Sequence, residues 1–355
     1  MPTFRSFAFR KASLSLAMVS TGALFFIGTF LPIAHAVVTK PAVHSVSAPV
    51  SVFSTYPSPE LVALCNEPES RCEEDSITAD EFVSALKATS YLTSLQPYAE
   101  NNDYELLIAN VGKVSTQFAE ITLQWRGMEI NSHIVKTSAH KQAESGTDGQ
   151  NKKLKHAETL IKQWKDNAVN EGIFTAEFLY RALEASNYQH DLAVPNSFGQ
   201  FTKLDTQLFA DPFSGAITRY THPAYEDALV DVIVYPFTHK ITEDDRTLLN
   251  EQLDVDLAKA SAVAKAQKLT LTLSSPAAPY KVKGIADGWR LGITAESEKA
   301  PTLYASTYVF RKHDKIIKIA TTFPTDFSDP LVDELIQRVD VPKESLLMKR
   351  VRKLL

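Results

Sequence analysis

Residues 308–320 read Tyr308-Val-Phe-Arg-Lys-His-Asp-Lys-Ile-Ile-Lys-Ile-Ala320. Aromatic and β-branched residues gather on both sides of the polar stretch from Lys312 to Asp314, which is the pattern of two strands joined by a tight turn. The first of these strands extends back to about residue 303, and two more are predicted upstream at 269–273 and 288–294. The segment therefore predicts an antiparallel hairpin within a larger sheet.

The residues on either side of these strands complete the pattern of the second half. Three strands are predicted at 207–209, 216–220 and 229–235, separated by Asp-Pro, Ser-Gly and His-Pro turns. A long helix is predicted after Thr242, which can cap it, as far as about Lys268. A last helix, predicted at 328–339, gives the order strands, helix, strands, helix. That order indicates the α+β class, with antiparallel sheets and packed helices.

The first half gives a similar but weaker pattern. Thr78-Ala-Asp-Glu81 is a capping box that predicts a helix, and residues 104–109 and 118–125 predict paired strands. The polar residues 141–155 predict a surface loop, and further helices are predicted from about Lys155 and at 175–186. We therefore expect an N-terminal α+β domain at 60–194 and a C-terminal α+β sandwich domain at 195–342.

Two of these helical stretches resemble each other. Residues 78–95 and 175–192 share seven identities at a spacing of 97 residues, for example Thr78 with Thr175 and Tyr91 with Tyr188. The match indicates either a duplication or two amphipathic helices of similar composition. Both interpretations stay open on the sequence alone.

The N-terminus has the pattern of a signal peptide over residues 1–36. A basic stretch from Arg5 to Lys11 precedes an apolar run at 12–31, and the small residues Ala34 and Ala36 follow Pro32. We expect cleavage after Ala36, and an extended linker at 37–59. The alternative is an uncleaved inner-membrane anchor through residues 12–31, since this run is long enough to span a bilayer.

The chain has two cysteines, Cys65 and Cys72, both beyond the signal in a polar segment. In an exported protein this pair predicts a disulfide and a periplasmic, oxidising location. A redox-active pair is the alternative, but the spacing differs from the Cys-x-x-Cys motif of such proteins.

Several motifs of the second half resemble a known group. These motifs are Asp211-Pro-Phe-Ser-Gly215, Asp231-Val-Ile-Val-Tyr-Pro236 and Lys318-Ile-Ala-Thr-Thr-Phe-Pro324. Through them, residues 192–342 resemble a group of uncharacterised exported proteobacterial proteins. Their order of strands and helices is similar to that of PsbP, Mog1 and DcrB-like α/β sandwich proteins. That resemblance implies a sandwich fold and a non-catalytic binding or assembly role, and it transfers no catalytic residue.

The sequence lacks recognisable catalytic and metal-binding motifs. The sequence has no Gly-x-Ser-x-Gly, His-Glu-x-x-His or P-loop pattern. Ser138 and Lys141 have a Ser-x-x-Lys spacing without supporting motifs, and His222, Asp227 and Asp231 are interpreted as turn, loop and strand residues. We therefore predict no catalytic, cofactor or metal site, and no nucleic-acid binding, because the net charge is −5.

Two segments are candidate contact sites. Trp289 follows the turn signal Asp287-Gly288, so its indole is a candidate pocket-lining group at a strand end. Residues 343–355 are predicted to form a basic amphipathic helix with Leu347, Val351 and Leu354 on one face. That face could rest on a membrane surface or a partner, or it could pack on the domain itself.

The sequence thus indicates an exported envelope protein, and a non-catalytic periplasmic binding or assembly factor is the leading interpretation. Its partner would be an envelope protein or a small ligand. The alternatives are an envelope hydrolase without a recognisable motif and a peripheral membrane protein that docks through the C-terminal helix.

Overall fold

The structure of the chain is a computed structural model that describes residues 45–65, 72–113, 116–137, 149–285, 287–297 and 300–355. These residues all belong to one compact unit, 43–355. Within these ranges no helix is both long and apolar enough to cross a membrane. The signal peptide, with Ala34, Ala36 and the candidate anchor at 12–31, lies outside the described residues.

The first sheet is built from residues 46–136. Its strands are β1 (Val46–Ser54), β2 (Glu73–Glu74), β3 (Leu92–Pro97), β4 (Tyr104–Lys113), β5 (Thr116–Trp125) and β6 (Met128–Lys136). The strand order is β3-β1-β4-β5-β6, and β2 pairs with β4. β1 runs parallel to both of its neighbours, whereas the other pairs are antiparallel. β6 is therefore the last strand at one edge of this sheet.

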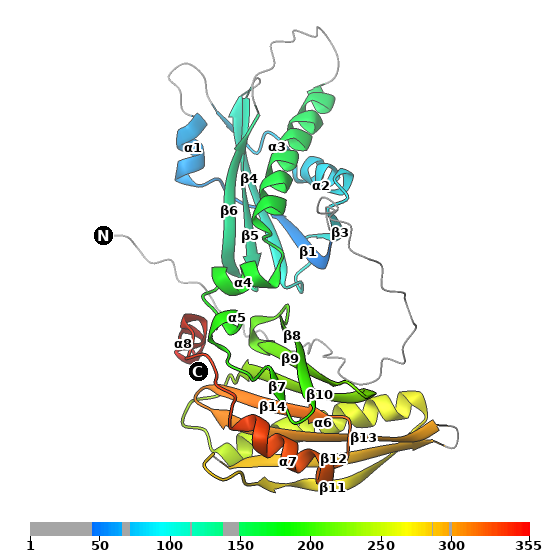
Figure 1. Cartoon of the computed structure of the whole chain (residues 1–355). Coiled ribbons are helices and arrows are strands. Elements are labelled where there is room, and N and C mark those ends of the chain that lie inside the picture. Colours follow the sequence, from blue (N-terminus) through cyan, green and yellow to red (C-terminus); the bar gives the residue numbers. More distant parts are fainter. Residues whose placement is uncertain (1–44, 66–71, 114–115, 138–148, 286, 298–299) are drawn as a thin grey trace. The chain divides into compact units, whose positions relative to one another are not determined.

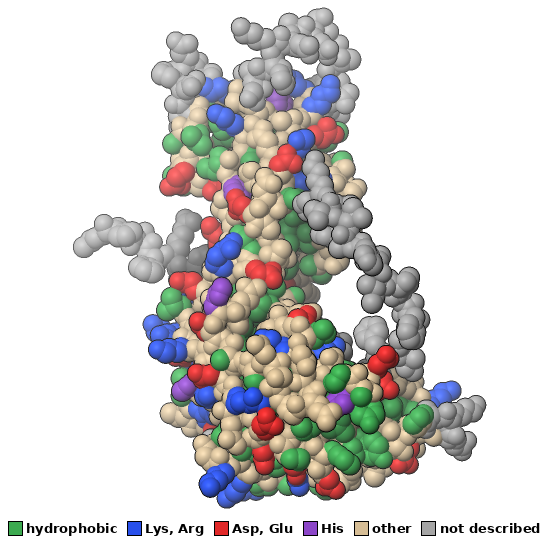
Figure 2. Space-filling view, viewed as in Figure 1, with side chains coloured by type: hydrophobic (Ala, Val, Ile, Leu, Met, Phe, Trp, Pro, Cys, Tyr) green, Lys and Arg blue, Asp and Glu red, His purple; other side chains and the backbone are tan. Residues whose placement is uncertain are grey.

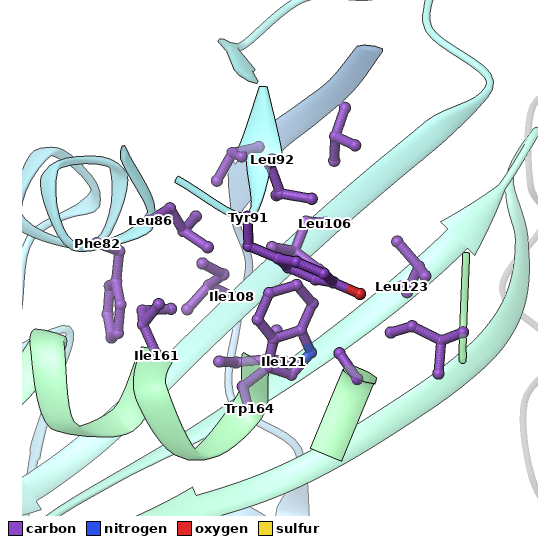
Figure 3. Packing of buried hydrophobic residues seen from close by; sticks show 14 of the residues in the cluster. Phe82, Leu86, Tyr91, Leu92, Leu106, Ile108, Ile121, Leu123, Ile161 and Trp164 are labelled. Carbon is purple, nitrogen blue, oxygen red and sulfur yellow. The ribbon is translucent and has the colours of Figure 1, made fainter. Parts of the chain in front are cut away.

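Helices pack on both faces of the first sheet. The helices of this half are α1 (Pro59–Cys65), α2 (Ala79–Ala88), α3 (Gly149–Glu171), α4 (Ala176–Ala182) and α5 (Tyr188–Asp191). Burial alternates strictly along β5, so that Ile121 and Leu123 face α2 and α3 in one core. α1 packs on the opposite face, on Ala109 and Val111. Figure 3 shows the larger core, in which Phe82, Tyr91 and Trp164 lie between the helices and the strands.

The second sheet has eight strands in the order β11-β12-β13-β14-β10-β9-β8-β7, and all its pairs are antiparallel. Its strands are β7 (Ser197–Phe198), β8 (Phe201–Leu208), β9 (Ala216–His222), β10 (Tyr225–Pro236), β11 (Thr270–Tyr280), β12 (Gly288–Ser297), β13 (Ala300–Lys312) and β14 (Lys315–Thr321). The remaining helices are η1 (Pro212–Ser214), α6 (Asp245–Gln267), α7 (Thr325–Ile336) and α8 (Leu346–Arg352).

Both faces of this sheet are covered by helices (Figure 1). Tyr308 packs in a cluster with residues of α7, and the next residue, Val309, packs in a cluster with residues of α6. Because successive strand residues point to opposite faces, α6 and α7 lie on opposite sides of the sheet. The predicted α+β class is therefore confirmed.

Several local predictions are confirmed with adjusted bounds. β13 and β14 form the predicted hairpin, whose last pair joins Lys312 to Lys315. The long helix is α6, but its cap is Asp244 and not Thr242, since an Asp244 carboxylate oxygen accepts the Thr247 amide at 3.0 Å. In the two similar stretches 78–95 and 175–192, Thr78 and Thr175 both cap helices. The stretches differ beyond these helices, because a strand follows α2 and a helix follows α4.

Two predictions for the first half are wrong. Residues 37–59 do not form only a linker, because Val46–Ser54 is β1, where Val50 is buried completely between two neighbouring strands. The loop predicted at 141–155 ends earlier, because α3 already begins at Gly149. β6 was not predicted, and the division into two domains near residue 195 stays a prediction.

Candidate functional site

The first wall of the candidate site is α1. The Leu61 amide donates to Ser58 Oγ at 3.1 Å at the start of this helix, and the Ser58 amide donates to Glu120 of β5 at 3.3 Å. Leu61 and Cys65 are buried on the strands, whereas the Leu64 side chain between them is 51% exposed. The helix thus holds one large apolar side chain at the surface beside the sheet.

A disulfide joins α1 to the sheet. Cys65 is bonded to Cys72, as predicted, and Cys72 directly precedes β2, which pairs with β4. Both cysteines belong to the small cluster under α1, with Leu61, Ala109 and Val111. The bond therefore fixes the C-terminal end of α1, next to Leu64.

We expect replacement of both cysteines by serine to lower the free energy of unfolding by about 2.5 kcal/mol, since the bond closes a short loop of the unfolded chain. Urea unfolding followed by circular dichroism measures this loss. Reduced wild-type protein is the control and should show the same loss. A change below about 0.5 kcal/mol in both samples would mean that α1 is held by its apolar contacts alone.

The second wall is one side of α3. Gln163, Asn167 and Glu171 recur every four residues, so they lie in one row along the helix. The Gln163 carboxamide donates from Nε2 to the Lys136 carbonyl at 2.9 Å and accepts the Lys136 amide at 3.3 Å. At the other end of the row, Glu171 accepts from Asn131 Nδ2 at 3.1 Å and lies 3.2 Å from Nε2 of His133. This polar row follows the edge of β6.

Between the two walls lies a groove around the edge strand β6, which we call the β6 groove. Its volume is about 630 Å³, within the range of small-ligand sites. Figure 1 shows β6 between α1 and α3. The lining residues are apolar on the α1 side and mainly polar on the α3 side: Leu64, Phe118, Ile134, Val135, Lys136, Gln163, Asp166 and Asn167.

The β6 groove combines an exposed apolar wall with a polar one. Leu64 and Ile134 are large apolar side chains that remain 51% and 42% exposed, and a ligand that covers them gains from their burial. The opposite wall offers carboxamides and a carboxylate, with Asp166 paired to Lys162 at 2.9 Å. The groove therefore suits an extended ligand with one apolar and one polar side.

The predicted contact residues lie elsewhere. Trp289 in β12 is half-buried and packs against the cluster under α6. In α8, Leu347 is buried and Val351 is half-buried against the large core of the first sheet, whereas Leu354 is 74% exposed. Contact of this helix with a membrane or a partner stays a prediction.

The C-terminal segment is also held by charged groups. Lys315 and Asp314 are almost fully buried, with 2.5 Å between Nζ and the carboxylate. Arg352 reaches Asp314 at 3.4 Å and donates to the Phe237 carbonyl at 2.7 Å. Burial lowers the pKa of Lys315, and the neighbouring Asp314 carboxylate opposes that shift. This buried ion pair is structural, as it ties α8 to the hairpin.

Figure 2 shows acidic and basic side chains interspersed over the face that it draws. Among the described residues, no group of three or more His, Cys, Asp or Glu side chains is placed to hold a metal ion.

The β6 groove was missed in the sequence, although two signals exist. Ile130 and Ile134 lie among polar residues in 128–136, and the polar row of α3 has helical spacing. Neither signal shows that the two segments lie together.

Comparisons with known proteins give weak likenesses. No family model matches the chain, and no curated protein does. The solution structure of cyanobacterial PsbP (CyanoP) from Synechocystis is 15% identical, covering 44% of this chain and 89% of that one, with a TM-score of 0.31. Protein XCC0632 from Xanthomonas campestris is 13% identical over 42% of this chain and 96% of that chain, with a TM-score of 0.24.

The T6SS immunity protein TplEi from Pseudomonas aeruginosa is 10% identical over 78% of this chain and 88% of that chain, also with a TM-score of 0.24. A PsbP structure is thus among the weak structural neighbours. With TM-scores this low, none of the three assigns a fold family or a function to the chain.

Proposed function

We propose that this protein is a non-catalytic binding or assembly factor of an oxidising envelope compartment, and that it holds its partner in the β6 groove. The observation that carries the proposal is the groove itself, where exposed Leu64 and Ile134 face a polar helix across an edge strand. The Cys65–Cys72 disulfide supports an oxidising compartment, because such bonds persist mainly in exported proteins.

Site-specific photocrosslinking in intact cells tests the proposal. A photoreactive phenylalanine analogue is placed at Leu64 or Ile134 of the full chain, and at Leu204 as a control. Leu204 is also exposed, at 66%, but lies in β8 of the other sheet. We expect the same discrete adduct from both groove positions and not from Leu204.

Equal capture from all three positions, or none from the groove, would contradict a binding role for this surface. Turnover of an envelope substrate by the purified chain, abolished by one side-chain change, would instead favour an envelope hydrolase. Mass spectrometry of the adduct distinguishes a protein partner from a small ligand.

A further inference from the structure

The outer edge of β6 presents backbone hydrogen-bonding groups. The Thr137 amide donates to the Gln117 carbonyl at 2.8 Å, which makes this pair a hydrogen-bonded one between β6 and β5. Hydrogen-bonded and non-bonded pairs alternate along an antiparallel ladder. By the observed register, the N–H and C=O groups of Lys136, Ile134 and Ser132 therefore point away from β5.

The Gln163 side chain makes, at one of these positions, the hydrogen bonds that a neighbouring strand would make. Its carboxamide donates to the Lys136 carbonyl and accepts from the Lys136 amide. A residue of an added antiparallel strand makes the same two bonds. Within the described residues, the outward backbone groups of Ile134 and Ser132 have no such partner.

The groove walls suit the two faces of an added strand. Alternate residues of such a strand would point toward α1, where Leu64, Phe118 and Ile134 are apolar. The others would point toward α3, where Asp166 and Asn167 are polar. Outward backbone groups that recur every second residue, about 6.6 Å apart, fit a polypeptide better than a small molecule.

We propose that the β6 groove takes an extended segment of a partner protein, which adds to β6 as a further strand and displaces the Gln163 carboxamide from Lys136. The segment would alternate apolar residues with polar ones, the apolar ones facing Leu64 and Ile134. This inference rests on the proposed function, for which it names the class of partner. Main-chain bonds would supply affinity and the two walls specificity.

Backbone-modified peptides test the mode of binding directly. Nine-residue peptides that alternate apolar and polar residues are selected from a display library against the full, disulfide-bonded chain. The peptide that binds most tightly is then synthesised in two methylated forms. One form carries N-methyl groups on the odd-numbered amides and the other on the even-numbered amides, and we call these the two methylation registers. We expect methylation in one register to weaken binding at least about tenfold, because it removes donors to β6, and in the other less than about twofold.

Variants of the protein give the matching test. Gln163→Ala removes the competing carboxamide and should tighten peptide binding about threefold to tenfold. Ser132→Pro removes an outward amide that β5 does not use, and an edge strand tolerates proline at such a position. It should weaken binding at least about tenfold, while the control Ser132→Ala should not. Circular dichroism checks that Ser132→Pro is folded, and the N-methyl peptides decide the question if it is not.

Equal losses from both methylation registers, or no peptide selected, would overturn strand addition. If crosslinks from Leu64 and Ile134 still identify a partner in that case, the proposed function stands and only the mode of binding fails. Concentration-dependent dimers of Gln163→Ala in sedimentation would overturn the inference in favour of a second copy of this chain at the same edge.

Discussion

Replacing Trp164 by alanine is expected to lower the free energy of unfolding by about 3–5 kcal/mol. Its side chain is fully buried, and its ring meets that of Tyr91 edge-on, with 6.3 Å between the ring centroids. Figure 3 shows the indole between α3 and the strands, beside Tyr91 and Ile121. The closely packed neighbours cannot fill the space that alanine leaves. Urea unfolding followed by circular dichroism measures the loss.

A conservative variant separates packing from hydrogen bonding at this position. In the described part of the chain, Nε1 of Trp164 has no hydrogen-bond partner, and burial of an unpaired N–H group costs about 1–3 kcal/mol. Trp164→Phe keeps most of the ring contacts and removes that group. We therefore expect it to lose much less stability than Trp164→Ala.

Gln163→Ala is the matched control on the same helix, because the Gln163 side chain faces the β6 groove and not the core. Its loss should stay within about 1 kcal/mol. Equal losses for the Ala and Phe variants of Trp164 would contradict the packing argument. Because Trp164 anchors α3 on the sheet, it also positions Gln163 beside β6.

Elements with local signals could be predicted from the sequence. The capping box at Thr78 forms with both of its bonds, since the Thr78 amide donates to Glu81 at 2.7 Å and the Glu81 amide donates to Thr78 Oγ1 at 3.4 Å. The hairpin around Asp314 could be predicted because strand-forming residues lie on both sides of a short polar turn. In both cases the residues that interact are close in sequence.

The pairing of β1 and the walls of the β6 groove depend on residues that are distant in sequence. Residues 46–54 contain three Val, three Ser and single Ala, Pro and Phe residues, without charge. The uncharged Ser and Pro residues are typical of a linker, yet the segment pairs in parallel with β3 and β4. The β6 groove needs Leu64, Ile134 and Gln163, which lie on three elements far apart in sequence. Only the tertiary fold brings them together, so the sequence alone could not predict the site.

Asp314→Asn is expected to lower the free energy of unfolding by about 3–5 kcal/mol at neutral pH, since it leaves the buried Lys315 ammonium without its countercharge. The side chains of Lys315 and Asp314 are 0% and 2% exposed, so water cannot replace the lost partner. Arg352 and Glu344 also face this pair, and Arg352 loses a contact with Asp314. Urea unfolding at pH 7 measures the effect.

The loss should also depend on pH. Burial lowers the pKa of Lys315 below its ordinary value of 10.5, and Asp314 opposes that shift, so its removal should lower this pKa further. Between the folded and unfolded pKa values the unfolded state binds more protons, and the stability of the fold therefore rises with pH. The difference between Asp314→Asn and the wild type should shrink as the pH rises from 7 toward 10.

A double variant tests whether the loss comes from the unpaired charge. Asp314→Asn combined with Lys315→Met removes both charges and keeps an apolar stem in the buried site, and replacing both partners of a buried pair is often close to neutral. We expect it to recover most of the stability that Asp314→Asn loses, and to show no extra dependence on pH between 7 and 10. A single-variant loss below about 1 kcal/mol, or one that stays constant between pH 7 and 10, would mean that Lys315 is already neutral in the native protein. In that case α8 would be held by its apolar residues Leu347 and Met348.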